Sequence, residues 1–177
     1  MKTRLFTALF WLGLGLAQAA PPPAGQLIAQ AGVKAVADGK AIYVHFGASW
    51  CGWCKRHDAF LEGPTIKPVF EKYFLPVKVV VQESEQNKGL ENPGAAALLE
   101  KFGGPSGLPF SAFLDAKGAL IVNSKRGSDQ GPAGGNIGHP FGPEEIDWFV
   151  VMMKKAAPKI AAEDLKIIEA ALRAQKK

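Results

Sequence analysis

Residues 41–61, AIYVHFGASWCGWCKRHDAFL, pass from an apolar run to a helical pattern across a pair of cysteines. Residues 41–46 are mostly apolar, as in a buried strand, and residues 47–50 form the turn after it. The N-terminus of a helix offers free N–H groups and a positive dipole end, which stabilise a thiolate, the reactive form of cysteine. We therefore interpret Cys51 as a nucleophile and Cys54, one turn further on, as the cysteine that resolves a mixed disulfide.

The chain has no other cysteines, and the spacing of this pair allows several interpretations. A c-type haem site needs a histidine directly after the second cysteine, where this chain has Lys55. A structural zinc site needs four ligands, and neither His45 nor His139 belongs to a second paired motif. His57 follows Cys54 by one turn, so a metal-handling site stays open, as does an inert disulfide. A loop this short constrains the unfolded chain little, so the spacing favours thiol–disulfide chemistry without metal or cofactor.

The rest of the sequence alternates between helical and strand patterns. Helices are predicted at residues 25–37, 51–61, 65–74, 95–102, 143–156 and 162–174, and strands at residues 41–46, 77–81, 110–114 and 119–122. Strand–helix–strand units imply parallel pairing with right-handed crossovers, and Asp115-Ala116-Lys117-Gly118 predicts an antiparallel hairpin. This order predicts a three-layer α/β/α sandwich with a mixed central sheet and an extra C-terminal helix.

The last predicted helix is amphipathic, with Leu165, Ile168 and Leu172 on one stripe. We expect this stripe to pack on the body of the protein, and a dimer face is the alternative. Residues 125–142 are rich in glycine and proline and exceed the usual length of a connection. They are either a binding loop or a mobile connection.

Residues 1–20 form a separate segment. Lys2 and Arg4 precede an apolar run, and Ala17-Gln18-Ala19 has the small-x-small pattern of a cleavage site. The run is shorter than the roughly 20 apolar residues that cross a bilayer. We therefore predict a cleaved signal peptide, a periplasmic or secreted protein and no stable membrane insertion after cleavage, with an uncleaved anchor as the alternative.

The composition is that of an ordinary globular protein, with 47% hydrophobic and 21% charged residues. Lys2 and Arg4 are the only charged residues of the predicted signal peptide, so cleavage lowers the formal net charge from +5 to +3. The sequence shows no stripe of lysine and arginine. This weak charge argues against nucleic acid as the main partner.

Residues 46–55, FGASWCGWCK, resemble the active-site segment of the thioredoxin superfamily. The resemblance is closest to exported thioredoxin-like proteins, including the thioredoxin-like domain of the periplasmic reductant-transfer system. It extends to Asn92-Pro93-Gly94, to Gly107-Leu108-Pro109 before a strand and to the 115–118 hairpin, and covers roughly residues 38–155.

The resemblance implies a thioredoxin fold, and together with the N-terminal segment and the last amphipathic helix it predicts a division of the chain into three parts. These are the signal peptide at residues 1–20, a thioredoxin-like domain at residues 21–157 and a C-terminal amphipathic helix at residues 158–177, packed on that domain.

The resemblance also implies a substrate-binding region. In that family the proline that matches Pro109 is cis and lies against the cysteine pair, which places the Leu108 backbone where an extended substrate can pair with it. Only about 5–6% of X-Pro bonds in folded proteins are cis, so this expectation depends on the resemblance alone. Trp50, Gly52 and Trp53 complete the expected substrate-binding residues, although we expect Trp50 itself to be mostly packed.

Two positions depart from thioredoxin. His45 occupies the place of a buried aspartate in the strand before the active site. It is either a proton acceptor for Cys54 or a neutral, hydrogen-bonded core histidine. Trp53 replaces a proline, and the Gly-Trp spacer offers no cation to Cys51. We therefore expect the pKa of Cys51 to lie closer to thioredoxin's value of about 7 than to the value of about 3.5 of a strong oxidant, although the basic residues after Cys54 lower it.

The resemblance and the cysteine pair together predict an exported thiol–disulfide oxidoreductase that leans towards reduction. Its expected partners are protein thiols and disulfides and an upstream electron donor in the membrane. Two alternatives remain. One is a non-catalytic thioredoxin-like binding module with a structural disulfide, and the other is a metal-handling protein that uses Cys51, Cys54 and His57.

Overall fold

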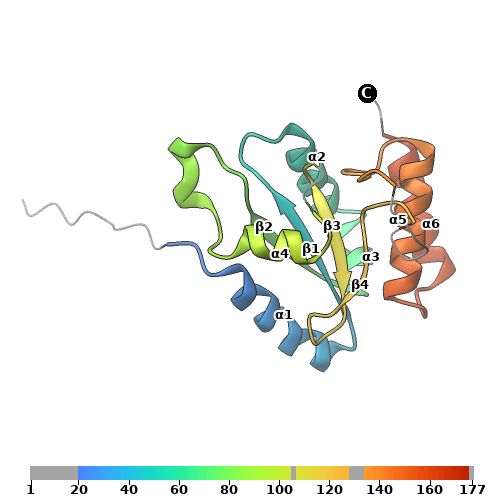
Figure 1. Cartoon of the computed structure of the whole chain (residues 1–177). Helices are drawn as coiled ribbons and strands as arrows, with labels where there is room; N and C mark the ends of the chain where they lie inside the picture. The colour runs from blue at the N-terminus through green and yellow to red at the C-terminus, as the bar shows by residue number, and fades with distance from the viewer. Residues whose placement is uncertain (1–19, 105–106, 128–133, 176–177) are drawn as a thin grey trace, which may run out of the picture.

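A four-stranded mixed sheet lies at the centre of the protein, in the order β2-β1-β3-β4 (Figure 1). The computed structural model describes residues 20–104, 107–127 and 134–175. Strand β1 (Ala41–Gly47) pairs in parallel with β2 (Phe74–Val80) and antiparallel with β3 (Phe110–Leu114), which pairs antiparallel with β4 (Leu120–Asn123). The predicted mixed sheet is therefore confirmed.

Helices cover both faces of the sheet. The structure contains α1 (Ala24–Asp38), α2 (Gly52–Leu61), α3 (Lys67–Glu71), α4 (Ala95–Lys101), α5 (Pro143–Ala156), α6 (Ala162–Arg173) and the short 3-10 helix η1 (Glu85–Leu90). Ile42, Val44 and Phe46 of β1 pack with α1 and α4, whereas Tyr43 faces the core that contains residues of α2, α3, α5 and α6. Because both faces are covered, every residue of β1 is buried. The predicted α/β/α sandwich is confirmed.

Two predicted boundaries are wrong where α3 meets β2. The predicted helix at residues 65–74 ends at Glu71, and the next strand begins at Phe74 rather than at residue 77. Pro76 lies inside this strand, opposite Tyr43 of β1. A proline lacks the N–H that a central strand needs, but β2 is an edge strand and tolerates it.

The apolar stripe of α6 faces the body of the protein. Leu165, Ile168 and Leu172 are buried in the same core as α5, so the stripe is not free to form a dimer face. The Tyr73 hydroxyl donates to Asp164 at the start of α6 and accepts from the backbone N–H of the residue before the helix. These contacts attach the C-terminal helices to the α3 side of the sheet.

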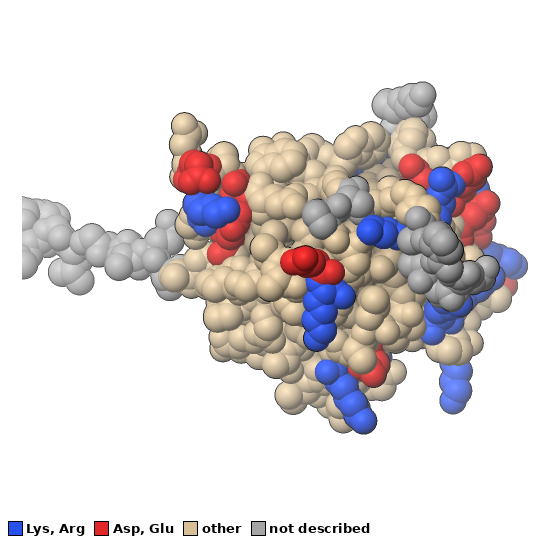
Figure 2. Space-filling model, viewed as in Figure 1, with Lys and Arg blue, Asp and Glu red and all other residues tan. Residues whose placement is uncertain are grey.

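Of the signal peptide predicted at residues 1–20, residues 1–19 lie outside the described residues, which begin just before Pro21-Pro22-Pro23. The Pro22 carbonyl accepts a hydrogen bond from Asn92, so this segment is attached to the domain. Among the described residues, no helix has the length and apolar character required to cross a membrane. On the face shown in Figure 2, acidic and basic side chains are interspersed over an uncharged surface.

Candidate active site

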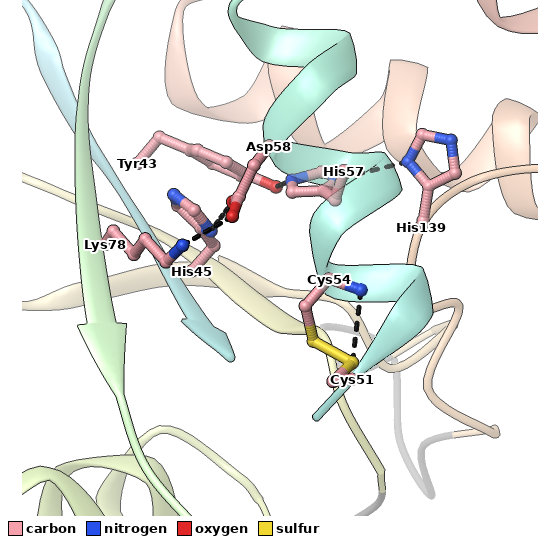
Figure 3. Close-up of polar contacts among 8 residues, drawn as sticks. All are labelled: Tyr43, His45, Cys51, Cys54, His57, Asp58, Lys78 and His139. Carbon is pink, nitrogen blue, oxygen red and sulfur yellow. Dashed lines mark hydrogen bonds and ion pairs between the residues drawn. A yellow bond between two sulfur atoms is a disulfide. The ribbon is translucent and has the colours of Figure 1, made fainter. Parts of the chain in front are cut away.

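The cysteine pair lies at the start of α2, where β1 ends (Figure 3). Cys51 is the N-cap residue of the helix and forms a disulfide with Cys54. The Cys51 sulfur also accepts a hydrogen bond of 3.1 Å from the backbone N–H of Cys54. The structure therefore presents the oxidised form of the pair at a helix N-terminus, as the strand-to-helix pattern indicates.

Gly47 lets the disulfide lie close to the end of β1. A Cβ atom at Gly47 would lie 3.2 Å from the Cys54 Cβ and 3.3 Å from its sulfur, which is closer than ordinary van der Waals contact. Both cysteines are only 4% exposed, and with Ala48 they form a small apolar cluster. Sequence reasoning placed Gly47 in the turn and missed this role.

The two tryptophans beside the disulfide are exposed. Trp53 is 50% exposed and Trp50 is 60% exposed, so the expectation that Trp50 is mostly packed is wrong. The indole N–H of Trp50 donates a hydrogen bond to the Gln82 carbonyl. This bond holds one edge of the ring, and the rest of the ring faces solvent. Gly52 is also exposed, so the disulfide lies among apolar and backbone surface that a partner can reach.

The Leu108–Pro109 peptide bond is cis, as the resemblance implies. Leu108 packs against the apolar cluster that contains both cysteines. A groove of about 470 Å³ lies beside it, and its lining includes Trp53, Leu108 and Pro109 together with residues 136–139 and 141–142. The structure therefore brings these predicted substrate-binding residues together and adds a segment that sequence reasoning could not place.

His45 is buried beneath α2, and its polar contact is with Asp58 rather than with a cysteine (Figure 3). The Nδ1 atom lies 3.5 Å from the Asp58 carboxylate, which also accepts a hydrogen bond from Lys78. Burial lowers the pKa of His45 to about 4, although Asp58 acts in the opposite direction. At neutral pH His45 is therefore an uncharged imidazole.

The structure gathers all three histidines of the chain, a cluster that sequence reasoning missed. The rings of His45 and His57 lie 5.5 Å apart, and those of His57 and His139 lie 5.4 Å apart. The His57 Nε2 atom lies 2.7 Å from the hydroxyl of the buried Tyr43, and its Nδ1 atom lies 3.1 Å from Nδ1 of His139. Burial, the largest cause, lowers the pKa values of His57 and His139.

The contacts of Gln175, the last member of this series of hydrogen bonds, show which atom donates in each of them. Arg56 has only N–H donors, and it bonds to the Gln175 Oε1 atom that also lies 2.6 Å from His139 Nε2. His139 therefore donates through Nε2 and accepts through Nδ1 from His57. His57 in turn accepts through Nε2 from the Tyr43 hydroxyl. The donors of Tyr43, His57 and His139 therefore all point along this series towards Gln175, which follows α6.

This arrangement argues against a metal site that uses His57 with the cysteines. Both nitrogens of His57 are engaged by Tyr43 and His139, and the two sulfurs are bonded to each other. Within the described part of the chain, no three or more histidine, cysteine, aspartate or glutamate residues are grouped as metal ligands.

A buried glutamate supports the turn before the cysteines. The Glu83 carboxylate accepts hydrogen bonds from the Ser49 backbone N–H at 2.5 Å and from the Ser49 hydroxyl at 2.6 Å. Glu83 is only 7% exposed, whereas Ser49 is exposed, so the two bonds lie at the edge of the buried region. The polar stretch at residues 83–93 gave no signal of this contact, because Glu83 and Ser49 meet only through the fold.

Comparisons with known proteins agree with the fold and with the cysteine pair. A family model described as thioredoxin-like matches residues 26–116. A disulphide isomerase from Xylella fastidiosa Temecula1 is 23% identical with a TM-score of 0.50, covering 64% of this chain and 82% of that one. A structure named DsbH oxidoreductase is 22% identical with a TM-score of 0.47, covering 83% and 95%.

A third structure, the oxidised DsbD C-terminal domain from Neisseria meningitidis, is 22% identical with a TM-score of 0.40, covering 59% and 84%. No curated protein sequence matches this chain. The first structural match supports the fold alone, and the weaker two add no argument. The family model spans more than half of the chain, including both cysteines and Pro109. The chain therefore belongs to the thioredoxin-like family and carries the redox-active disulfide of a thiol–disulfide oxidoreductase.

Proposed function

We propose that the protein is an exported thiol–disulfide oxidoreductase that acts mainly as a reductant of protein disulfides. The observation that carries this proposal is the position of the disulfide at the N-terminus of α2. There the Cys51 sulfur accepts a hydrogen bond from the backbone N–H of Cys54. In the reduced protein the same N–H and the helix dipole stabilise a thiolate on Cys51. Cys51 is thus the nucleophile and Cys54 the resolving cysteine.

The reaction begins when the Cys51 thiolate attacks one sulfur of a substrate disulfide. A mixed disulfide forms, and the first substrate sulfur leaves as a thiolate and takes up a proton. Cys54 then loses its proton and attacks the Cys51 sulfur, which releases the second substrate sulfur and closes the Cys51–Cys54 bond. Two electrons pass from the protein to the substrate, and the upstream membrane donor that we propose restores the dithiol.

The residues between and after the cysteines support the proposed preference for reduction. Gly52 and Trp53 provide no cation to stabilise the Cys51 thiolate. The guanidinium of Arg56 lies 5.4 Å from the centre of the Trp53 ring and 4.8 Å from that of Phe141. A less stabilised thiolate favours the disulfide form of the protein, and this makes the dithiol the better electron donor.

His45 is our candidate for the proton acceptor of Cys54. It lies in the strand that leads to the disulfide, and at neutral pH its imidazole is uncharged and able to accept a proton. Its pKa of about 4 makes it a weak base, so we propose a minor contribution to the rate.

The export and the organisation of the chain are part of the same proposal. We propose a signal peptide at residues 1–20, a thioredoxin-like domain at residues 21–157 and the C-terminal helix at residues 158–177. The mature protein would then work in the periplasm or outside the cell, where disulfides form and persist.

The experiment measures reduction of insulin and of a small disulfide by the purified protein, with Cys51→Ser as the control. We expect turnover by the wild type alone, and equal activity of the two proteins would contradict an enzymatic role. A Cys54→Ala variant should accumulate mixed disulfides, whereas a binding module with a structural disulfide would form none. A reduction potential near about −270 mV is expected for a reductant, and a value near about −120 mV would contradict the direction.

A further inference from the structure

Asn136 ties the loop that contains the cis-proline to the rest of the domain. Its side-chain nitrogen donates to the carbonyls of Gly107 and Pro109, each at 3.0 Å. Its oxygen accepts from the Ser124 hydroxyl at 2.6 Å and from the Gly138 N–H at 3.2 Å. An amide side chain has two donors and two acceptor sites, so Asn136 is fully used in this position.

These bonds hold both neighbours of Leu108 while leaving Leu108 itself open. Within the part of the chain that the structure describes, the backbone N–H and carbonyl of Leu108 form no hydrogen bond. Its side chain meanwhile packs against the cysteine cluster. An unpaired N–H and carbonyl on an extended segment are the groups to which an added peptide strand bonds. Asn136 therefore fixes the direction in which these two groups point.

The segment after Asn136 also lines the groove. Gly138 has a φ of +59°, which suits glycine, and a Cβ atom there would lie 3.8 Å from the Pro109 ring, so the chain passes close to the cis-proline at this point. The rings of His139 and Phe141 then lie 6.2 Å and 5.8 Å from the Trp53 ring. The same loop thus contacts the cis-proline loop on both sides of Leu108 and adds aromatic side chains to the lining of the groove of about 470 Å³.

We infer that Asn136 is a positioning residue for polypeptide substrates, which it serves by presenting the Leu108 backbone to an extended peptide whose disulfide lies at Cys51. This inference rests on the proposed function. The matching substrate is an unfolded or extended chain with an apolar side chain near its cysteine, because the groove is lined by Trp53 and Phe141. A small disulfide forms no backbone ladder and gains nothing from Asn136.

The test compares Asn136→Asp with the wild type on a peptide disulfide and on a small disulfide. The aspartate keeps the size and the acceptor oxygen of Asn136 but loses both donors to the loop carbonyls. Gln30→Glu, on the exposed side of α1, is the matched control for the added charge. Asn136→Ala serves as the second variant if the aspartate prevents folding, and thermal melting monitors the fold of each protein.

We expect KM for the peptide to rise about tenfold in Asn136→Asp, equivalent to the loss of about one backbone hydrogen bond. We expect kcat, the reduction potential and the rate with the small disulfide to stay at the wild-type values. An unchanged KM for the peptide would overturn the role of Asn136, and so would an equal rise of KM with the small disulfide. Either result would leave the proposed function intact. Absence of Cys51-dependent turnover in the wild type would overturn the proposed function and this inference with it.

Discussion

Lowering the pH from 7 to 5 should destabilise the folded protein, because the buried His45 gains a proton only when the protein unfolds. An unfolded histidine has a pKa of about 6.5, whereas burial lowers the pKa of His45 to about 4 in the folded state. The pKa values of His57 and His139 are lowered as well. Below pH 6.5 the unfolded chain therefore binds more protons than the folded one. The stability is fully present above about pH 6.5 and is lost as the pH falls towards 4.

The size of the effect follows from the two pKa values of His45. Each pH unit between them removes about 1.4 kcal/mol, so His45 alone lowers the free energy of unfolding by about 2 kcal/mol at pH 5. Asp58 favours the charged imidazole and Lys78 opposes it, but burial is the largest influence on this pKa. His57 adds a loss in the same direction. Domains have free energies of unfolding of about 5–15 kcal/mol, so the loss of about 2 kcal/mol from His45 is a large fraction of the total.

The assay is urea unfolding of the oxidised protein at pH 7 and pH 5, followed by tryptophan fluorescence. The wild type is compared with His45→Gln, which removes the titrating group beside Asp58. Carboxylates that titrate in this range contribute to both proteins, so they cancel in the difference. We expect the variant to lose about 2 kcal/mol less than the wild type between the two pH values. Equal losses would refute the assignment of His45 as a buried neutral histidine.

Three substitutions test other contacts, each by urea unfolding. Gly47→Ala should lower the free energy of unfolding by about 1–3 kcal/mol, because the new methyl group would crowd Cys54, and no loss would contradict that close approach. Glu83→Gln should remove about 1–3 kcal/mol by weakening the charge-assisted bonds to Ser49, and an unchanged midpoint would show that the turn does not need them. Leu172→Ala should remove about 2–5 kcal/mol, since Leu172 is only 1% exposed, whereas a loss below 1 kcal/mol would mean that α6 packs weakly.

Much of the fold could be predicted because its signals are local. The apolar run of β1, the helical pattern after Cys51 and the hairpin before β4 each occupy a few consecutive residues. The error at α3 and β2 has the opposite origin. Pro76 is a breaker by local rules, and it is tolerated only because the sheet places β2 at its edge.

The features of the candidate site also divide into those with a local sequence signal and those that depend on the fold. The cysteine pair was readable from its spacing, and the cis bond before Pro109 from a resemblance, because both belong to short motifs. The exposure of Trp50 was not readable, since it depends on where the Gln82 carbonyl lies. The contact between Glu83 and Ser49 joins residues 34 positions apart, and no pattern in either segment predicts the other.

The chain of hydrogen bonds from Tyr43 to Gln175 links the active-site helix to a part of the protein that the family match does not cover. The match ends at residue 116, yet His139 and Gln175 lie beyond it and orient His57 on α2. Gln175 is itself held by the Arg56 guanidinium and donates to the Pro140 carbonyl, so its amide has a single orientation. The C-terminal residues therefore act on the same helix that carries Cys54. A truncation after α5 would remove the acceptor for His139 and leave a buried imidazole N–H without a partner, so we expect it to lower the free energy of unfolding measured with urea.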